Sequence, residues 1–370
     1  MKIKCLKSDL LNSVNIVLKA VPAKSTMPIL ECLIIDASSN GIKLIANDME
    51  IGIETFVKGD MIEEGTIALN AKVFSEIVRR LPENEVSITA DDNFITEIIC
   101  EKAKFSIVGR SGEEFPVLPE IEKENPLILS QFALKEIIRQ TVFSISDNEN
   151  NKIMSGELFE IKKDTLRVAS LDGHRISIRK IRLSKEYEDS KVIIPGKTLS
   201  EVSKILSGEA SSFANIYFTE KHALFEFDET VVVSRLIEGE YFRIDQMLSS
   251  DYETKVTINK KELLSCIERA SLLIRETDKK PIIISIGDNN LQLSINTALG
   301  SMKEEIDIEL EGKDIVIGFN PKYIMDALRV IDDETVDIYL INSKTPCFLR
   351  DKDQSYIYLI LPVNIQVNAD

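Results

Sequence analysis

The sequence predicts an α+β protein of three similar domains, each built from two copies of a strand–helix–strands unit. Three observations lead to this fold class. A lysine-bearing helical segment occurs three times, with starts 125 residues apart, and another helical segment precedes each copy. Between these segments apolar residues alternate with a period of two, which is typical of strands. The length of 370 residues is also too great for one ordinary core.

The helical segments form two sets. The lysine-bearing set begins at Asn70, Pro195 and Asn320, with Lys72, Lys197 and Lys322 at the third position. The preceding set opens with Ser8, Ser130 and Asn259, residues that are suited to the N-cap of a helix. Apolar side chains recur in these segments at helical spacing. We therefore expect six helices, two in each domain.

Two loop-like stretches indicate the domain boundaries. Residues 115–126 are rich in Pro and Glu, and residues 248–254 are mostly polar. The expected domains are residues 1–124, 125–249 and 250–370. Repetition alone leaves another interpretation open, namely three α+β domains duplicated for unrelated reasons, as in a concatenated binding module.

Composition excludes several classes of protein. No apolar run is long enough to span a bilayer, and the N-terminus lacks the features of a secretory signal, so we expect a cytoplasmic protein without a membrane partner. The five cysteines are scattered and form no C-x-x-C pair, which argues against a zinc cluster or a disulfide framework. We expect them to be small buried hydrophobic residues.

Charge is unevenly distributed along the chain. The six helical windows 7–24, 70–81, 130–143, 195–207, 259–280 and 320–331 contain 18 Lys and Arg against 9 Asp and Glu, and each is positive. They carry +9 in a chain of net charge −16, so the remaining residues carry −25. Six basic helices predict one surface that contacts a phosphate backbone without reading bases, although chance helix composition remains an alternative. The candidate DNA contacts are Lys19, Lys24, Lys72, Arg79, Arg80, Lys135, Arg139, Lys197, Lys204, Arg269, Lys322 and Arg329.

Catalytic motifs are missing from the sequence. There is no G-x-x-x-x-G-K-[ST] loop, no G-x-G-x-x-G turn and no G-x-S-x-G elbow. Of the two histidines, His174 lies beside Asp172 and close to Ser170, which leaves a hydrolase as an alternative function. A turn with a contact surface fits this cluster better, and we expect no enzyme, no metal and no cofactor.

The sequence resembles the bacterial DNA sliding clamp, the beta subunit of DNA polymerase III, over essentially the whole chain. The matching motifs are residues 26–30 (TMPIL), 47–50 (NDME), 172–175 (DGHR), 192–195 (VIIP), 318–320 (GFN) with Tyr323, and 361–363 (LPV). Each motif is weak by itself, but their order and spacing over three repeats are specific. The related two-domain trimeric clamps fit less well.

The resemblance implies a processivity factor that encircles double-stranded DNA. Each chain would form half of a closed ring, with helices inside and sheets outside, and two chains would make a homodimer. A groove between the second and third domains would bind short linear motifs of the replicative polymerase, the clamp loader, translesion polymerases and repair proteins. Carried over to this sequence, the groove comprises Met154, Leu171, Gly173, His174, Arg175, Ile176, Phe242, Met247, Asn320, Tyr323, Leu361, Pro362 and Val363. Its apolar members are also explained by ordinary core packing.

Three features depart from the family's pattern. Phe242 and Arg243 stand where the family usually has a proline and an acid, so we expect an altered groove wall. Lys24 replaces a common arginine, which keeps the charge but loses the bidentate fork. Residues 366–370 extend beyond the usual end and are expected to be disordered. The rival from another class is a monomeric multidomain scaffold that binds peptides and never DNA.

Overall fold

The computed structural model describes residues 1–148, 151–275, 280–351 and 353–365. In these residues six α-helices lie within the six predicted windows, and each follows a strand and precedes further strands, as predicted. The helices are α1 (Lys7–Val17), α2 (Ala71–Arg80), α3 (Gln131–Arg139), α4 (Gly196–Ile205), α5 (Lys260–Ser271) and α6 (Pro321–Val330). The predicted disorder of the tail, residues 366–370, concerns residues outside the described ones.

The chain divides into two compact units. The first holds residues 1–135 and 197–236, and the second holds residues 136–196 and 237–370. The chain passes between the units three times: within α3, within α4 and after Leu236.

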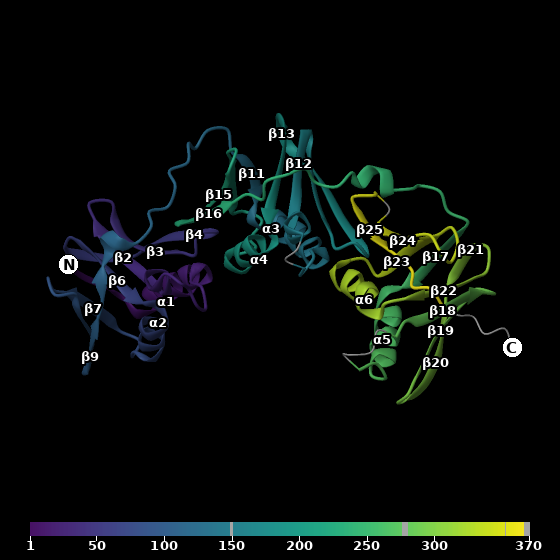
Figure 1. Ribbon diagram of the computed structural model, residues 1–370, viewed down its shortest axis with the longest axis horizontal. Coiled ribbons are helices and arrows are strands. Elements are labelled where there is room, and N and C mark those ends of the chain that lie inside the picture. The colour runs from purple at the N-terminus through teal and green to yellow at the C-terminus, as the bar shows by residue number, and fades with distance from the viewer. Residues whose placement is uncertain (149–150, 276–279, 352, 366–370) are drawn as a thin grey trace. The chain divides into compact units, whose positions relative to one another are not determined.

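The first unit contains two antiparallel sheets. The five-stranded sheet has the order β5 (Gly59–Glu63), β1 (Lys2–Leu6), β7 (Glu85–Ala90), β8 (Ile95–Cys100) and β9 (Ala103–Val108). The nine-stranded sheet has the order β10 (Arg110–Ser111), β6 (Gly65–Asn70), β2 (Cys32–Ser38), β3 (Gly41–Asn47), β4 (Ile51–Val57), β16 (Thr230–Arg235), β15 (His222–Phe227), β14 (Phe213–Phe218) and β11 (Leu127–Ser130). Helices α1 and α2 contact each other and lie on the same side of these strands (Figure 1).

The second unit repeats this arrangement. Its seven-stranded sheet has the order β12 (Gly156–Leu171), β13 (Arg175–Pro195), β25 (Tyr356–Ile360), β24 (Cys347–Arg350), β23 (Thr335–Leu340), β17 (Thr254–Asn259) and β21 (Glu309–Gly312). Its four-stranded sheet has the order β20 (Gly300–Asp307), β19 (Asn290–Thr297), β18 (Ile282–Gly287) and β22 (Ile315–Phe319). One apolar cluster fills the space between α5, α6 and both sheets.

The nine-stranded sheet of the first unit and the seven-stranded sheet of the second unit each run across a domain boundary that was expected from the sequence. In the first unit β4 pairs with β16, so that Ile53 lies opposite Val232. In the second unit β13 pairs with β25, so that Ile178 lies opposite Ile357. Main-chain hydrogen bonds therefore join segments that sequence analysis assigns to different domains. The three-domain division stays a prediction.

Helix starts follow the predicted N-caps in part. Asn259 accepts hydrogen bonds from the first backbone N–H groups of α5, and the Ser130 hydroxyl accepts one from Ala133. The prediction for Ser8 is wrong, because this residue lies inside α1 and Leu6 is the N-cap. Strand β1 leads directly into this helix, and the backbone N–H of Lys7 bonds to the carbonyl of Asn84. A distant carbonyl thus replaces the side-chain cap.

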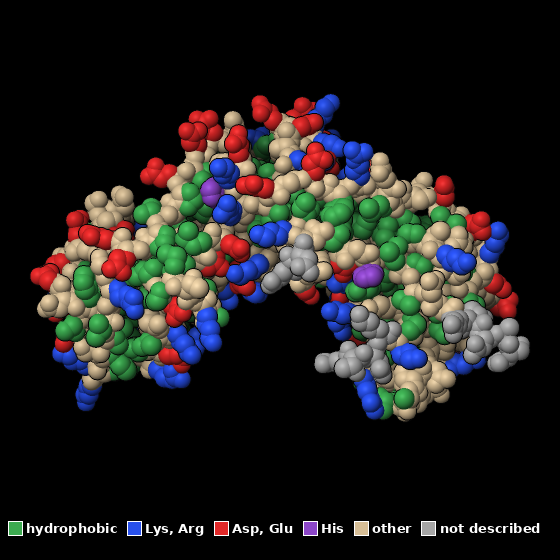
Figure 2. All heavy atoms as spheres, in the orientation of Figure 1, with side chains coloured by type: hydrophobic (Ala, Val, Ile, Leu, Met, Phe, Trp, Pro, Cys, Tyr) green, Lys and Arg blue, Asp and Glu red, His purple; other side chains and the backbone are tan. Residues whose placement is uncertain are grey.

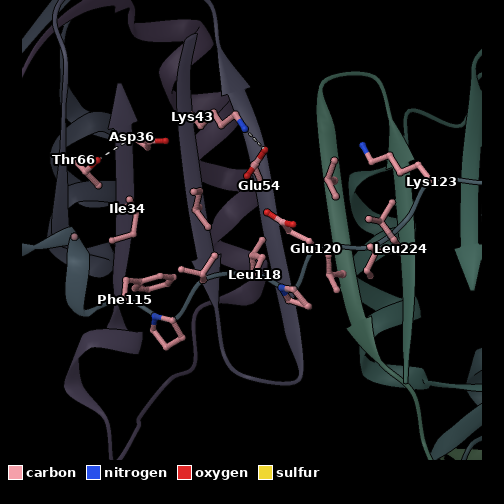
Figure 3. A pocket seen from close by; sticks show the side chains of 18 residues that line it. Ile34, Asp36, Lys43, Glu54, Thr66, Phe115, Leu118, Glu120, Lys123 and Leu224 are labelled. Atoms are coloured by element: carbon pink, nitrogen blue, oxygen red, sulfur yellow. Dashed lines mark hydrogen bonds and ion pairs between the residues drawn. The ribbon is translucent and has the colours of Figure 1, made fainter. Parts of the chain in front are cut away.

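The stretch that the sequence predicts to be a loop forms a strap, residues 115–123, across the nine-stranded sheet. Phe115 packs against Ile34 of β2, Leu118 contacts Gly52 of β4, and Ile121 packs against Leu224 of β15. The spacing of three residues between these anchors matches an extended chain with three residues per turn. Figure 3 shows Phe115, Leu118 and Leu224 around a hollow of about 690 Å³ beside the strap.

The cysteines behave as predicted. All five are free and buried. Burial raises the pKa of the Cys5 and Cys266 thiols to about 12, which keeps both protonated. In the described part of the chain, no helix has the length and apolar character needed to cross a membrane.

A buried carboxyl lies in the core of the second unit. Glu157 of β12 is fully buried, and its Oε2 accepts a hydrogen bond from Thr141 Oγ1 at 2.6 Å. Its Oε1 has no partner among the described residues. Burial raises the pKa of Glu157 to about 8, and the bond from Thr141 opposes this only in part. Near neutral pH the group is therefore mostly protonated.

Two neighbouring residues of α2 test how burial determines stability. The Phe74 side chain is 0% exposed and Val73 is 48% exposed. We expect Phe74→Ala to lower the free energy of unfolding by about 3–5 kcal/mol, because it leaves a cavity in the core. Val73→Ala is the matched control and should change it by less than about 0.5 kcal/mol. Urea unfolding followed by circular dichroism measures both; equal losses would contradict the described packing.

The raised pKa of Glu157 predicts how stability depends on pH. The folded chain keeps this proton between pH 4.5 and about 8, whereas the unfolded chain loses it, so the free energy of unfolding falls as pH rises through this window. We expect Glu157→Gln to flatten the dependence between about pH 5.5 and 8.5, since glutamine does not titrate. Urea unfolding at both pH values measures the effect. The exposed control Glu186→Gln should keep the wild-type slope, and an unchanged slope in Glu157→Gln would refute the prediction.

Candidate functional site

The candidate site begins at the tight turn between β12 and β13. Gly173 has φ 88°, a left-handed conformation that favours glycine, and nothing crowds its Cα. The Asp172 carboxylate accepts hydrogen bonds from the backbone N–H of His174 at 2.9 Å and of Arg175 at 3.1 Å. The turn exposes His174, while Leu171 before it and Ile176 after it are buried.

Arg175 is buried and holds this turn against two other elements. Its Nε donates to Asp172 Oδ2 at 2.8 Å, its Nη1 to Asp326 Oδ2 of α6 at 2.6 Å, and its Nη2 to the Phe143 carbonyl at 2.6 Å. The guanidinium also lies 4.5 Å from the centre of the Tyr323 ring. Arg175 therefore stabilises the walls of the site and is not an exposed contact residue.

The N-terminal end of α6 forms the second side of the site. The Asn320 side chain accepts a hydrogen bond from the Lys322 backbone N–H at 3.0 Å and caps the helix. Tyr323 follows Lys322 on α6, and its ring stacks on the His174 ring with the ring centroids 6.0 Å apart. The Tyr358 hydroxyl donates to the Tyr323 carbonyl at 2.7 Å. Two flat side chains thus lie next to each other at the edge of the site.

The C-terminal segment closes the third side. The Leu361 backbone N–H donates to the His174 carbonyl at 2.8 Å, and the Val363 N–H donates to the Gly318 carbonyl at 2.8 Å. Pro362, which lies between them, has no N–H to donate. Leu361 stays exposed, whereas Pro362 and Val363 are half-buried. This segment therefore presents an apolar surface beside His174 and Tyr323.

A second apolar group lies along the same hairpin. Leu171 and Ile176 belong to a buried cluster against which Met154 and Phe242 pack. Phe242 meets Tyr241 edge to face at 6.0 Å, so the residue in the place of a proline adds an aromatic wall. Arg243 next to it is exposed, as is Met247 at the end of the short helix Ile244–Met247.

All thirteen predicted groove residues lie in the second unit: on the β12–β13 hairpin, at the start of α6, in the C-terminal segment, and in the segments that hold Met154, Phe242 and Met247. For Met247 only its exposed position near this wall is established. Sequence reasoning missed Asp326, Phe143 and Tyr358, which hold Arg175 and Tyr323 in place. Asp326 follows Tyr323 by three residues on α6, so helical spacing was the one signal that could have found it.

The hydrolase interpretation finds no support in this geometry. Both carboxylate oxygens of Asp172 are used by the turn and by Arg175. The Ser170 hydroxyl is buried and donates to the Thr141 carbonyl, so it is not free to act as a nucleophile. The described residues also contain no group of three or more His, Cys, Asp or Glu that could hold a metal ion.

Eleven of the twelve predicted DNA contacts lie on or directly after the helices, whereas Lys24 lies seven residues after the end of α1. Most of the twelve have an acidic neighbour. Eight of the twelve form ion pairs: Lys19 and Lys204 with Glu201, Arg79 and Arg80 with Glu76, Arg139 with Glu136 and Asp332, Lys197 with Asp48, Arg269 with Glu304, and Arg329 with Glu268. Lys135 instead donates to the Leu206 carbonyl at 2.9 Å. Lys24, Lys72 and Lys322 are exposed and form no ion pair within the described ranges. In Figure 2, Lys and Arg side chains gather over α1 and α2 of the first unit.

Comparison with known proteins covers almost the whole chain. Family models of the DNA polymerase III beta subunit match residues 1–119 (N-terminal domain), 128–242 (central domain) and 245–364 (C-terminal domain). A beta sliding clamp of Halalkalibacterium halodurans is 38% identical over 367 residues, which are 95% of this chain and 96% of the relative.

Solved structures agree with the family models. A DNA polymerase III beta subunit from Eubacterium rectale is 61% identical with a TM-score of 0.96, and the match covers 99% of both chains. The DNA polymerase sliding clamp from Bacillus subtilis is 34% identical with a TM-score of 0.94, covering 99% of this chain and all of that one. The chain therefore belongs to the DNA polymerase III beta subunit family, the bacterial sliding clamps, and is a processivity factor of DNA replication and not an enzyme.

Proposed function

We propose that two copies of this chain close head to tail into a ring around double-stranded DNA, and that polymerases and other replication proteins bind the groove residues of the second unit. The main observation in favour of the groove is the stacked pair of His174 and Tyr323 rings beside the exposed Leu361. An apolar surface with a few polar markers suits a short linear motif. The replicative polymerase, the clamp loader, translesion polymerases and repair proteins are the partners that we propose.

Two open sheet edges support head-to-tail closure. Strand β9 ends the five-stranded sheet of the first unit, and β20 ends the four-stranded sheet of the second unit. Val108 at the end of β9 is 80% exposed, and so is Leu272 after α5. Open strand edges with exposed apolar side chains favour pairing with another chain, and a contact between two different surfaces can close into a ring.

The basic residues of the helices supply the proposed DNA contacts. Lys72 and Lys322 occupy equivalent places at the starts of α2 and α6, and both are exposed. Cations of this kind hold a phosphate backbone without reading bases, so they let the ring move along DNA. The acidic remainder of the chain would discourage contacts elsewhere.

Replacing one ring of the stacked pair tests the groove. We expect His174→Ala and Tyr323→Ala each to weaken binding of a motif peptide from the replicative polymerase at least about tenfold, because each removes part of the apolar surface. Fluorescence anisotropy with the labelled peptide measures affinity, and circular dichroism checks folding. Lys322→Ala, one residue from Tyr323 and outside the groove, is the matched control. Unchanged affinity in both groove variants would exclude this groove.

Retention on DNA tests the ring. We expect the chain, once loaded by its clamp loader, to stay on nicked circular DNA during gel filtration and to leave after the DNA is linearised. The reason is that enclosure, and not affinity, would hold it there.

The variant Val108→Asp tests the open edge. It should prevent retention on both DNAs, since a charge at the open edge opposes closure. Sedimentation should give the mass of two chains for the wild type and one for the variant. A single-chain mass for the wild type would favour the monomeric scaffold, and equal retention on both DNAs would exclude enclosure.

A further inference from the structure

A small hollow in the first unit shares no lining residue with the predicted groove or with the basic helices. It measures about 350 Å³ and lies beside the strap, residues 115–123, on the nine-stranded sheet. Pro116, Val117, Leu118 and Pro119 of the strap form one side, and the turn of residues 47–50 forms another. Strands β15 and β16 complete it with His222, Val233 and Arg235, together with Lys221 just before β15.

The polar wall of this hollow is cationic. His222 and Arg235 are direct partners across β15 and β16, and Lys221 precedes His222 in the chain. Neither Lys221 nor Arg235 forms an ion pair in the described ranges, and Glu50 is the acidic residue of the lining. Figure 2 shows a histidine with Lys and Arg side chains on both sides of it over β15 and β16. In a chain of net charge −16, this is a local excess of positive charge.

The direction in which the pKa of His222 is shifted agrees with a positive local charge. Burial lowers the pKa of His222, and the charges of Arg235 and Lys221 lower it further. Glu50 lines the same hollow, and its side chain is exposed. The potential at the imidazole is therefore positive, and a bound anion would relieve it.

The rim of the hollow is apolar and fixed. The Val117 side chain is 90% exposed and Met49 is 54% exposed. Met49 has φ 74°, a conformation that a methionine rarely adopts, and its backbone N–H is held by Asn47 Oδ1 at 2.8 Å. The Asn47 amide also donates to the Pro116 carbonyl at 3.4 Å, which ties the turn to the strap. Two large apolar side chains thus face solvent on a rigid frame next to unpaired cations.

We infer that this hollow is a second docking site, for a partner protein's short acidic segment that carries one large apolar side chain. Carboxylates of the segment bind Lys221 and Arg235, and the apolar side chain enters between Val117, Met49 and Val233. An acidic peptide fits better than nucleic acid, because an apolar rim and a hollow of this size suit one side chain, whereas DNA contacts are spread along a phosphate backbone. The site is independent of the proposed groove.

The two histidines of the chain make the two sites separately measurable. His174 lies in the proposed groove and His222 lies in the hollow, so a full-length chain labelled with ¹³C-histidine gives one imidazole signal for each. The probes are acetylated, amidated pentapeptides Glu-Asp-Xaa-Asp-Glu, in which Xaa is Leu, Ile, Phe or Met. We expect at least one probe to move the His222 signal in a saturable way and to raise the pKa of His222. A peptide with Gly as Xaa and a peptide with Lys at the acidic positions should have at least about tenfold weaker effects.

Charge reversal supplies the matched comparison. Lys221→Glu/Arg235→Glu should weaken probe binding at least about tenfold, since it replaces both proposed carboxylate contacts. Lys185→Glu/Lys344→Glu makes the same change in net charge at exposed lysines outside the hollow and should keep wild-type binding. Circular dichroism checks that both double variants are folded. If Lys221→Glu/Arg235→Glu is not folded, Val117→Ser tests the site instead, because it removes part of the apolar contact and should weaken probe binding.

Three outcomes would overturn the inference. A His222 signal that none of the probes moves would exclude the site. Equal shifts with the Gly peptide would show that charge alone acts and that no apolar side chain is bound. A larger shift with a decathymidine oligonucleotide than with any probe would assign the hollow to nucleic acid. Movement of the His174 signal concerns the groove alone, so the failure of one site is distinguishable from the failure of the other.

Discussion

The buried guanidinium of Arg175 is the interaction on which the candidate groove depends. It joins the turn after β12, the middle of α6 and the carbonyl of Phe143, three segments that lie far apart in the sequence. Removing one member of a buried ion pair costs about 3–5 kcal/mol, because the remaining charge is left without a partner. His174 and Tyr323 can stack only while these segments are held together. The rigidity of the groove therefore comes from a residue that is almost hidden from solvent.

Continuity of the sheets is the second constraint. Strand β4 pairs with β16 in the first unit, and β13 pairs with β25 in the second, so each unit contains an uninterrupted ladder across an expected domain boundary. The strap adds apolar anchors to the first of these joints, since Leu118 rests on Gly52 and Ile121 on Leu224. The proposed ring would depend on such joints, because a flexible joint would let it open.

Sequence reasoning predicted what is local or repeated. Helices and their order followed from apolar spacing, and buried cysteines from their scatter. The cap at Ser8 failed because the hydrogen bond to Lys7 comes from Asn84, and no local pattern indicates a partner at that distance. Arg175 was placed in the groove by resemblance, but its burial depends on Asp326 and Phe143. Pairing across long sequence separations is set by the fold, which is why the role of a residue was harder to predict than its position.

The ion pairs of the basic helix residues suggest how the proposed DNA-binding surface releases DNA. Arg79, for example, pairs with Glu76, and the two side chains are 52% and 39% exposed. Exposed pairs of this kind contribute about 0–1 kcal/mol, so exchanging a carboxylate for a phosphate oxygen costs little in either direction. A cation without any neighbour would hold phosphate more strongly and would slow movement. Partial neutralisation by Glu76 or Glu268 therefore suits the proposed DNA-binding surface, which would attract a polyanion and let it slide, with enclosure rather than affinity preventing its loss.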